Sequence, residues 1–204
     1  MSETGTVERL RAYRKTYWAM LVSSTLSLIA SLVLSYDAVK LAGSPSSKLS
    51  CDINAVVSCG KVAKSWQSAL LGFPNSFIGL MLEPVVITVA IAGLSLVVFP
   101  RKFMRVAHVG YGLGLLFALW LLSQSLFVIH ALCPWCLLVT ISTVTVFSTI
   151  TRVAILENIW NFSEARHASL VEFLDRGWGR VLYTVTYAVL ILAIYFKYGQ
   201  ELFA

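Results

Sequence analysis

Four cysteines carry the most distinctive chemistry of this chain, and they form two pairs. Cys51 and Cys59 are separated by seven residues, whereas Cys133 and Cys136 enclose a Pro-Trp dipeptide. A disulfide across two intervening residues closes a very small ring, so it adds little loop-closure stability. At the start of a helix, backbone N–H groups and the helix dipole lower the thiol pKa of such a pair, which favours the attacking thiolate. The second pair therefore predicts thiol–disulfide exchange.

Two other interpretations of the cysteines stay open at this point. A zinc site usually has two Cys-x-x-Cys knuckles, and the spacing of the first pair here does not provide the second one, so redox chemistry is favoured over metal binding. Structural disulfides in a protein without enzymatic activity are the other alternative. They predict that the bonds do not turn over with a dithiol.

The sequence around the cysteines is strongly apolar. Of its 204 residues, 58% are hydrophobic and only 13% are charged, which is outside the range of soluble domains. The net charge is +6, but the basic residues lie beside apolar segments and are not interleaved with polar and aromatic residues, so nucleic-acid binding is not indicated. These features predict an integral membrane protein.

Five segments are long and apolar enough to cross a hydrocarbon core, which needs roughly 20 helical residues. An open sheet would leave backbone groups unsatisfied in lipid, so each segment is expected to be a helix. We predict an all-α membrane protein with one membrane domain over residues 1–204. The expected transmembrane helices are residues 17–36, 77–99, 109–129, 133–151 and 178–196.

The distribution of Lys and Arg predicts the orientation. With the N-terminus in the cytoplasm, 11 basic residues lie on the inner side and 5 on the outer side. The first segment is expected to be retained, because it is long for a signal peptide and no small-x-small site precedes Asp37. All four cysteines then face the extracytoplasmic, oxidising side of the inner or plasma membrane.

Two longer connections join these helices. Residues 37–75 form an outer loop with the first cysteine pair, and residues 61–71 within it have the apolar spacing of a short amphipathic helix that lies over the bundle. Residues 152–177 are expected to extend the fourth helix and then lie at the cytoplasmic interface.

The order of these features resembles the vitamin K epoxide reductase family of membrane thiol oxidoreductases, whose bacterial members reduce quinones. The resemblance covers about residues 17–151. It rests on Cys51 and on three motifs: Cys59-Gly60-Lys61-Val62, Phe73-Pro74-Asn75-Ser76-Phe77-Ile78-Gly79 and Cys133-Pro134-Trp135-Cys136. For the fold, we expect a four-helix bundle around a quinone site plus one peripheral helix.

The resemblance implies roles for individual residues. Cys51 is similar to the shuttle cysteine that meets the redox partner, and Cys59 to the one that forms an internal disulfide with Cys133. Cys136 is similar to the thiol that faces the quinone. Asn75 matches a position that hydrogen-bonds a quinone oxygen, and Val62 a position that lines the pocket.

A quinone head group is flat and apolar with two carbonyl acceptors, so it needs apolar walls and one or two donors. Further candidates for walls and a second donor are Trp66, Ile78, Leu121 and Thr140. Packing within the bundle is the alternative role for all four. Thr140 stands where animal members of the family commonly have a tyrosine.

Partners follow from the resemblance as well. Many bacterial relatives continue into a thioredoxin-like domain, and this chain stops at Ala204. We therefore expect a separate extracytoplasmic thioredoxin-fold protein, similar to DsbA, as electron donor and a lipid quinone of the menaquinone or ubiquinone type as acceptor. A DsbB-like oxidase is the alternative, although that family has the two cysteine pairs in the reverse order.

Two further ionisable residues lie near these elements. Glu83 lies inside the second apolar segment, where a carboxylate must be paired, protonated or used as a proton relay. His130 precedes Cys133 and is either a thiolate-stabilising residue or a solvated interface histidine.

Overall fold

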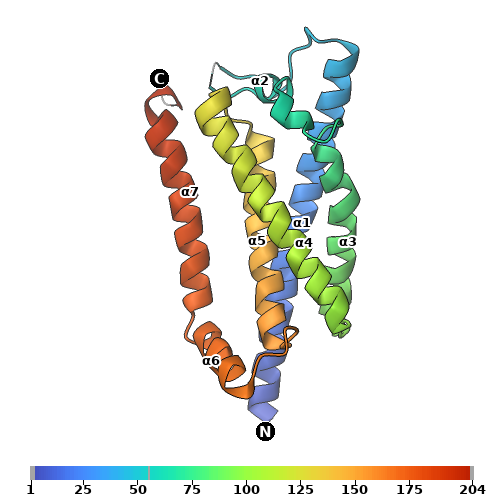
Figure 1. Cartoon of the computed structure of the whole chain (residues 1–204), viewed down its shortest axis with the longest axis vertical. Coiled ribbons are helices and arrows are strands. Elements are labelled where there is room, and N and C mark those ends of the chain that lie inside the picture. Colours follow the sequence, from blue (N-terminus) through green and yellow to red (C-terminus); the bar gives the residue numbers. More distant parts are fainter. Residues whose placement is uncertain (1–2, 55, 203–204) are drawn as a thin grey trace.

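The fold is described from a computed structural model that covers residues 3–54 and 56–202. Helices dominate it, and Figure 1 shows them as long, roughly parallel rods joined at their ends. The described elements are α1 (Glu3–Gly43), α2 (Cys59–Ala63), the 3₁₀ turn η1 (Trp66–Ala69), α3 (Ser76–Leu94), α4 (Arg101–Gln124), the π-helical turn η2 (Ser125–Ile129), α5 (Pro134–Leu156), α6 (Glu164–Asp175) and α7 (Trp178–Leu202).

Within the described residues, five helices are long and apolar enough to cross a membrane. They are Tyr13–Gly43, Ser76–Leu94, Arg101–Ile129, Pro134–Leu156 and Trp178–Gly199. Their number and order agree with the sequence prediction. The protein is therefore a multi-pass membrane protein with an all-helical membrane domain.

The helix boundaries differ from the predicted spans in two situations. Some apolar residues are not helical, and some helices continue into residues outside the apolar span. The segment predicted at residues 77–99 ends as a helix at Leu94, because Leu96 adopts a left-handed conformation with φ of 62°. Pro100 then caps the next helix, which begins at Arg101 and not at residue 109. Helix α1, by contrast, continues beyond its predicted span to Gly43. Helix α5 continues to Leu156, in agreement with the predicted extension of the fourth helix. Hydropathy reports only how apolar a segment is, whereas the hydrogen bonds of a helix can continue into polar sequence. The end of an apolar segment is therefore not always the end of a helix.

Four of the helices form one bundle, and α7 lies beside it. Helix α1 packs against both α3 and α5, and α4 packs against α5. Helix α7 contacts the bundle through α5 and stands apart from it at the side in Figure 1. The prediction of four bundled helices with one peripheral helix is confirmed.

Small residues allow α1 and α3 to approach closely. The buried stripe on α1 consists of Ser24, Ser27, Ser31 and Ser35. A Cβ added to Gly79 on α3 would overlap the side chain of Ser31. Higher along the same contact, the Ser35 hydroxyl donates a hydrogen bond to the Ser76 hydroxyl at 2.9 Å. Close contact between small polar residues is the usual way in which helices associate in lipid.

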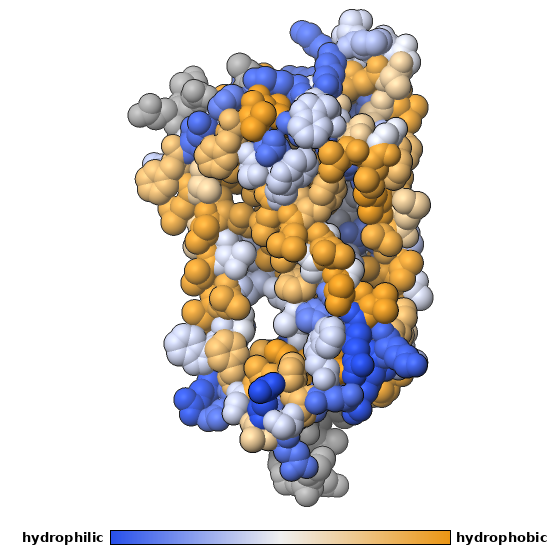
Figure 2. All heavy atoms as spheres, in the orientation of Figure 1, coloured by the Kyte–Doolittle hydropathy of each residue, from blue (hydrophilic) through white to orange (hydrophobic). Residues whose placement is uncertain are grey.

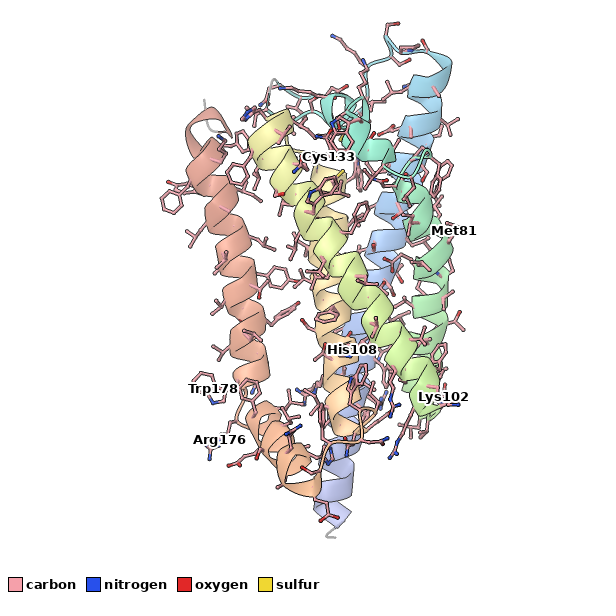
Figure 3. All side chains as sticks on the ribbon, viewed as in Figure 1. Met81, Lys102, His108, Cys133, Arg176 and Trp178 are labelled. Atoms are coloured by element: carbon pink, nitrogen blue, oxygen red, sulfur yellow. A yellow bond between two sulfur atoms is a disulfide. The ribbon has the colours of Figure 1, made fainter. Side chains whose placement is uncertain are left out.

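The two ends of the bundle have different compositions. The cysteine end comprises residues 44–75 and the start of α5, and the basic end carries Lys102, Arg152 and Arg176 together with α6. Figure 3 shows Cys133 at the upper end and Lys102 and Arg176 at the lower end. In Figure 2 an apolar band separates polar residues at the two ends of the same face. This segregation is typical of a membrane-spanning bundle.

The short elements over the cysteine end differ from the amphipathic helix predicted at residues 61–71. Two pieces are present: α2, and then the 3₁₀ turn η1. They are separated because Ser65 adopts an extended conformation with ψ of 149°, which interrupts helical hydrogen bonding. Figure 1 shows α2 lying across this end of the bundle.

Candidate functional site

Cys51 and Cys59 are joined in a disulfide, with their Cα atoms 5.6 Å apart. Cys51 lies in the loop after α1, and Cys59 is the first residue of α2. Both side chains are buried, in an apolar cluster with Leu41, Leu49 and Cys133. We call this set the cysteine cluster. It brings the loop pair into contact with the beginning of α5.

The carboxylate of Asp52 fixes the shape of this loop. Its Oδ1 atom accepts hydrogen bonds from the Ser58 hydroxyl and the Gly60 N–H, both at 2.8 Å, and Oδ2 accepts from the Leu49 N–H at 3.0 Å. Burial of Asp52 acts to raise its pKa, but these three hydrogen bonds and the charge of Lys64 outweigh it. The pKa of Asp52 is therefore lower than its ordinary value, and the ionised carboxylate holds the loop.

Glycine is required next to this carboxylate. A Cβ added to Gly60 would lie 2.8 Å from Asp52 Oδ2. The carboxylate has little freedom to withdraw, because it is already held by three donors. The Cys59-Gly60 step thus lets the loop close tightly around Asp52.

A short backbone bridge places the two cysteine pairs side by side. Val57 and Leu132 form a parallel β-bridge, in which the Leu132 N–H donates to Val56 O at 2.7 Å and the Ser58 N–H donates to Leu132 O at 3.0 Å. Since Leu132 precedes Cys133 and Ser58 precedes Cys59, the bridge aligns these two cysteines.

Cys133 and Cys136 are free thiols at the start of α5. Cys133 is the N-cap residue, and its sulfur accepts a hydrogen bond from the Cys136 N–H at 3.2 Å. Pro134 occupies the first turn, where its missing N–H removes no helical hydrogen bond. The sequence prediction of a redox pair at a helix start thus has the expected local geometry.

The environment of Cys133 favours its thiolate. The hydrogen bond from the Cys136 thiol is the largest influence, and the N–H groups of Cys136 and Trp135 act in the same direction. Burial and the negative charge of Asp37 oppose them. The pKa of the Cys133 thiol is lower than its ordinary value, which favours its thiolate form.

An apolar cavity of about 780 Å³ adjoins the cysteines. Residues of α1, α3, α4 and α5 line it, and Cys59, Cys133 and Cys136 lie on its wall. The volume is in the range of pockets that hold a drug-sized organic molecule. The two free thiols thus lie beside an apolar space that is large enough for such a molecule.

Five of the six residues predicted to contact a quinone line this cavity: Val62, Asn75, Ile78, Leu121 and Thr140. Trp66 does not line it. Its side chain is 63% exposed and packs against the ring of Trp120 at 6.2 Å between centroids. The break between α2 and η1 lies directly before Trp66.

Two polar side chains on the cavity wall, Asn75 and Thr140, already form hydrogen bonds within the protein. Asn75 Nδ2 donates to Gln67 O at 2.7 Å, and its Oδ1 accepts from the Leu70 N–H at 3.3 Å, so this side chain ties η1 to the start of α3. An amide nitrogen has two hydrogens, and the second is available to a ligand. The Thr140 hydroxyl donates to Cys136 O at 2.9 Å. Asn75 is therefore the better placed donor of the two.

Glu83 lies on the cavity wall deep in the bundle, and its carboxylate is fully hydrogen-bonded. The Ser27 hydroxyl donates to Oε1 at 2.7 Å and the Tyr111 hydroxyl donates to Oε2 at 3.1 Å. Glu83 is therefore paired inside the bundle, which is one of the predicted alternatives for this residue. Sequence reasoning did not identify the two partners, because they lie on α1 and α4 and only the packing brings them to Glu83.

His130 is exposed and adopts a left-handed conformation with φ of 54°. Its backbone carbonyl accepts a hydrogen bond from Lys61 Nζ at 3.1 Å. Of the two predicted roles for His130, these contacts fit that of a solvated histidine at the interface.

Asp52 was missed by the sequence reasoning, although an acidic residue directly after the first cysteine was a usable signal.

Comparisons with known proteins agree with this geometry. The model of the vitamin K epoxide reductase family matches residues 18–151, which include both cysteine pairs and the helices that line the cavity. A comparison with curated proteins returns no match. The matched region is more than half of the chain and contains every element that shapes the site. The chain therefore belongs to the vitamin K epoxide reductase family, and this family membership makes it a membrane thiol oxidoreductase.

Proposed function

We propose that this protein is a thiol:quinone oxidoreductase that reoxidises an extracytoplasmic thioredoxin-fold protein, similar to DsbA, and reduces a lipid quinone of the menaquinone or ubiquinone type. One observation carries the proposal. The Cys51–Cys59 disulfide and the free Cys133 and Cys136 thiols meet in one cluster beside an apolar cavity. This arrangement supports a relay in which one pair receives electrons from outside and the other delivers them to an apolar acceptor.

The described redox state is one step of the proposed cycle. The Cys136 thiolate delivers two electrons to the quinone, and Cys133 closes the Cys133–Cys136 disulfide. The two thiols lose two protons and two electrons in total, and the quinone gains both to become the quinol. The cysteine pair is then ready to be reduced by the loop pair.

The partner supplies the next electron pair. A thiolate of its dithiol attacks the Cys51–Cys59 disulfide at Cys51, and resolution by its second thiol leaves Cys51 and Cys59 reduced. Cys59 then attacks Cys133, and the transient Cys59–Cys133 disulfide passes the electrons to the inner pair. The adjacency of these two cysteines in the cluster supports this step.

The quinone is proposed to enter the cavity from the lipid between α3 and α4. Both helices contribute to the cavity wall, yet α3 packs mainly on α1, and α4 mainly on α5. Figure 1 shows α3 and α4 diverging toward the cysteine end. Asn75 then donates to a quinone oxygen, while Val62, Ile78 and Leu121 supply apolar walls.

The proposal places the N-terminus in the cytoplasm and the cysteine end outside, in an inner or plasma membrane. The basic residues of the loops and of α6 support this orientation, because positive charge is retained on the cytoplasmic side. Through its partner, the protein would support disulfide-bond formation in proteins outside the membrane.

The test is the rate of quinone reduction by the full chain in liposomes with a dithiol donor, followed by absorbance. Wild type and Ser169→Ala, an exposed position on α6, are expected to turn over equally. Cys136→Ser is expected to lose at least about 100-fold in rate, because it removes the group that reduces the quinone. If wild type shows no thiol-dependent rate with either quinone type, the cysteines are structural and the proposal is rejected.

A further inference from the structure

Asp37 lies near the end of α1 on the helix face that packs against the cysteine cluster. Leu34 and Leu41, three residues before it and four after it, are both packed in that cluster. Residues at these spacings share one face of a helix. The Asp37 side chain is only 5% exposed, so the carboxyl group is enclosed on that face.

One oxygen of this carboxyl group has no hydrogen-bond partner. Among the described residues, the buried side-chain atoms without a partner are Asp37 Oδ2 and Arg152 Nε, and these two lie at opposite ends of the bundle. Leaving a buried acceptor unpaired is unfavourable, because the group has lost its hydrogen bonds to water without replacing them. A carboxyl group held in this state is suited to exchange a proton with a neighbour.

The charged and titratable groups around Asp37 come from three elements. Lys40 is on α1 itself and Asp52 is on the redox loop, and both act electrostatically on Asp37. From α5, the Cys133 thiol is within reach of the Asp37 charge, which disfavours its thiolate. Lys40 forms no ion pair with Asp37, since its ammonium group is directed to Lys48 O at 3.4 Å. Of the two free thiols, Cys133 is therefore the one whose titration is known to respond to the charge of Asp37.

We propose that Asp37 is the proton carrier for thiol–disulfide exchange between Cys59 and Cys133, a role that rests on the proposed function and deepens it. Exchange inside an apolar cluster needs such a group. Cys59 must lose its proton to attack and Cys133 must gain one when it leaves, but these two residues are only 1% and 2% exposed to solvent. A buried carboxyl group near Cys133 can accept the proton of Cys59 and later return it to Cys133. No hydroxide or hydronium ion then has to cross the apolar packing.

The proton balance of the exchange is as follows. Cys59 gives its proton to the Asp37 carboxylate and attacks Cys133, so the Cys59–Cys133 bond forms and the Cys133–Cys136 bond breaks. Cys136 leaves as the thiolate that reacts with the quinone. Cys51 then loses its proton to bulk water and attacks Cys59, which re-forms the Cys51–Cys59 disulfide. Cys133 leaves and takes back the proton that Asp37 held.

The experiment measures this exchange without a quinone, so it is independent of whether a quinone is the acceptor. The full chain in detergent is oxidised at both pairs and mixed with dithiothreitol. Quenched alkylation and mass spectrometry then give the rate at which Cys133 and Cys136 become thiols, from pH 5.5 to 8.5. The variants are Asp37→Asn, Asp37→Glu and, as a control, Asp175→Asn at an exposed position on α6.

Asp37→Asn is expected to slow the exchange by about 100-fold near neutral pH, the lower end of the range for loss of a general acid–base group. Its rate should also follow only the titration of the thiols, without the additional dependence due to a carboxyl group. Asp37→Glu should restore part of the rate and of that dependence, and Asp175→Asn should equal wild type. The inference is overturned if Asp37→Asn keeps the wild-type rate and pH profile. It is equally overturned if all Asp37 variants lose rate by the same factor at every pH, which indicates a purely structural role.

Discussion

At the scale of single residues, the Asp52 carboxylate determines how the loop disulfide is presented. Its pKa is lowered, so its contribution to stability is fully present above the unfolded-state pKa of about 3.9 and is lost as the pH falls through the lower folded-state pKa. We predict that Asp52→Asn lowers the unfolding temperature by the same amount throughout pH 5–8. The difference from wild type should shrink on acidification below about pH 4.

Thermal unfolding in detergent across this pH range checks the prediction, with Asp175→Asn as a control that should equal wild type. A difference that increases on acidification would contradict the lowered pKa of Asp52. A difference that is constant down to pH 2 would show that Asn disturbs the loop for another reason.

Gly60 gives a second prediction at this scale. An alanine Cβ would meet Asp52 Oδ2 at 2.8 Å, so Gly60→Ala must displace a carboxylate that three donors hold. The expected destabilisation is about 1–2 kcal/mol, the value of one or two lost hydrogen bonds. Gly43→Ala is the matched control, because nothing lies within 4 Å of its added Cβ. Equal unfolding temperatures for the two variants would refute the tight fit at Gly60.

At the scale of helices, the α1–α3 contact depends on residues that lack a side chain. A Cβ on Gly93 of α3 would overlap the ring of Tyr17 on α1, which is fully buried. We predict that Gly93→Ala destabilises the protein by about 1–3 kcal/mol through overpacking, measured by unfolding in mixed detergent. Gly110→Ala on α4 has nothing within 4 Å and should be neutral or slightly stabilising. Similar destabilisation by both substitutions would show that the effect is not a contact between α1 and α3.

At the scale of the whole molecule, the segregation of charge predicts the orientation in the membrane. Two single cysteines, Ser46→Cys at the cysteine end and Ser163→Cys at the basic end, are placed in a chain whose four native cysteines are serine. In intact cells a membrane-impermeant maleimide should label only the first, and the second only after permeabilisation. The opposite pattern would reverse the proposed orientation and remove the loop pair from an external partner.

Much of the architecture was predictable because lipid simplifies the rules. Apolar length identified five spanning helices, since a hydrocarbon core requires about 20 helical residues and excludes unpaired backbone. The end of α3 was not predictable in this way. Residues 97–99 are apolar but belong to a loop, because the left-handed turn at Leu96 is a local backbone event that hydropathy does not record.

The candidate site was predictable only in part. Val62, Asn75, Ile78, Leu121 and Thr140 line the cavity as expected, but Trp66 lies outside it. The continuous helix predicted for residues 61–71 is interrupted at Ser65, directly before Trp66. Such a local backbone change is not evident from apolar spacing.

The sequence by itself determined the chemistry available and the number of helices, because both depend on residues that are close together in the chain. Only the tertiary structure decided which groups meet. It places Cys59 beside Cys133 through the Val57–Leu132 bridge, pairs Glu83 with Ser27 and Tyr111, and encloses Asp37 at the cysteine cluster. The physical reason is that helices in lipid carry apolar residues on their lipid-facing sides as well as in their contacts, so hydropathy does not mark which face meets a neighbour. That choice depends on small-residue contacts and on satisfying buried polar groups, and these become evident only when the helices are packed.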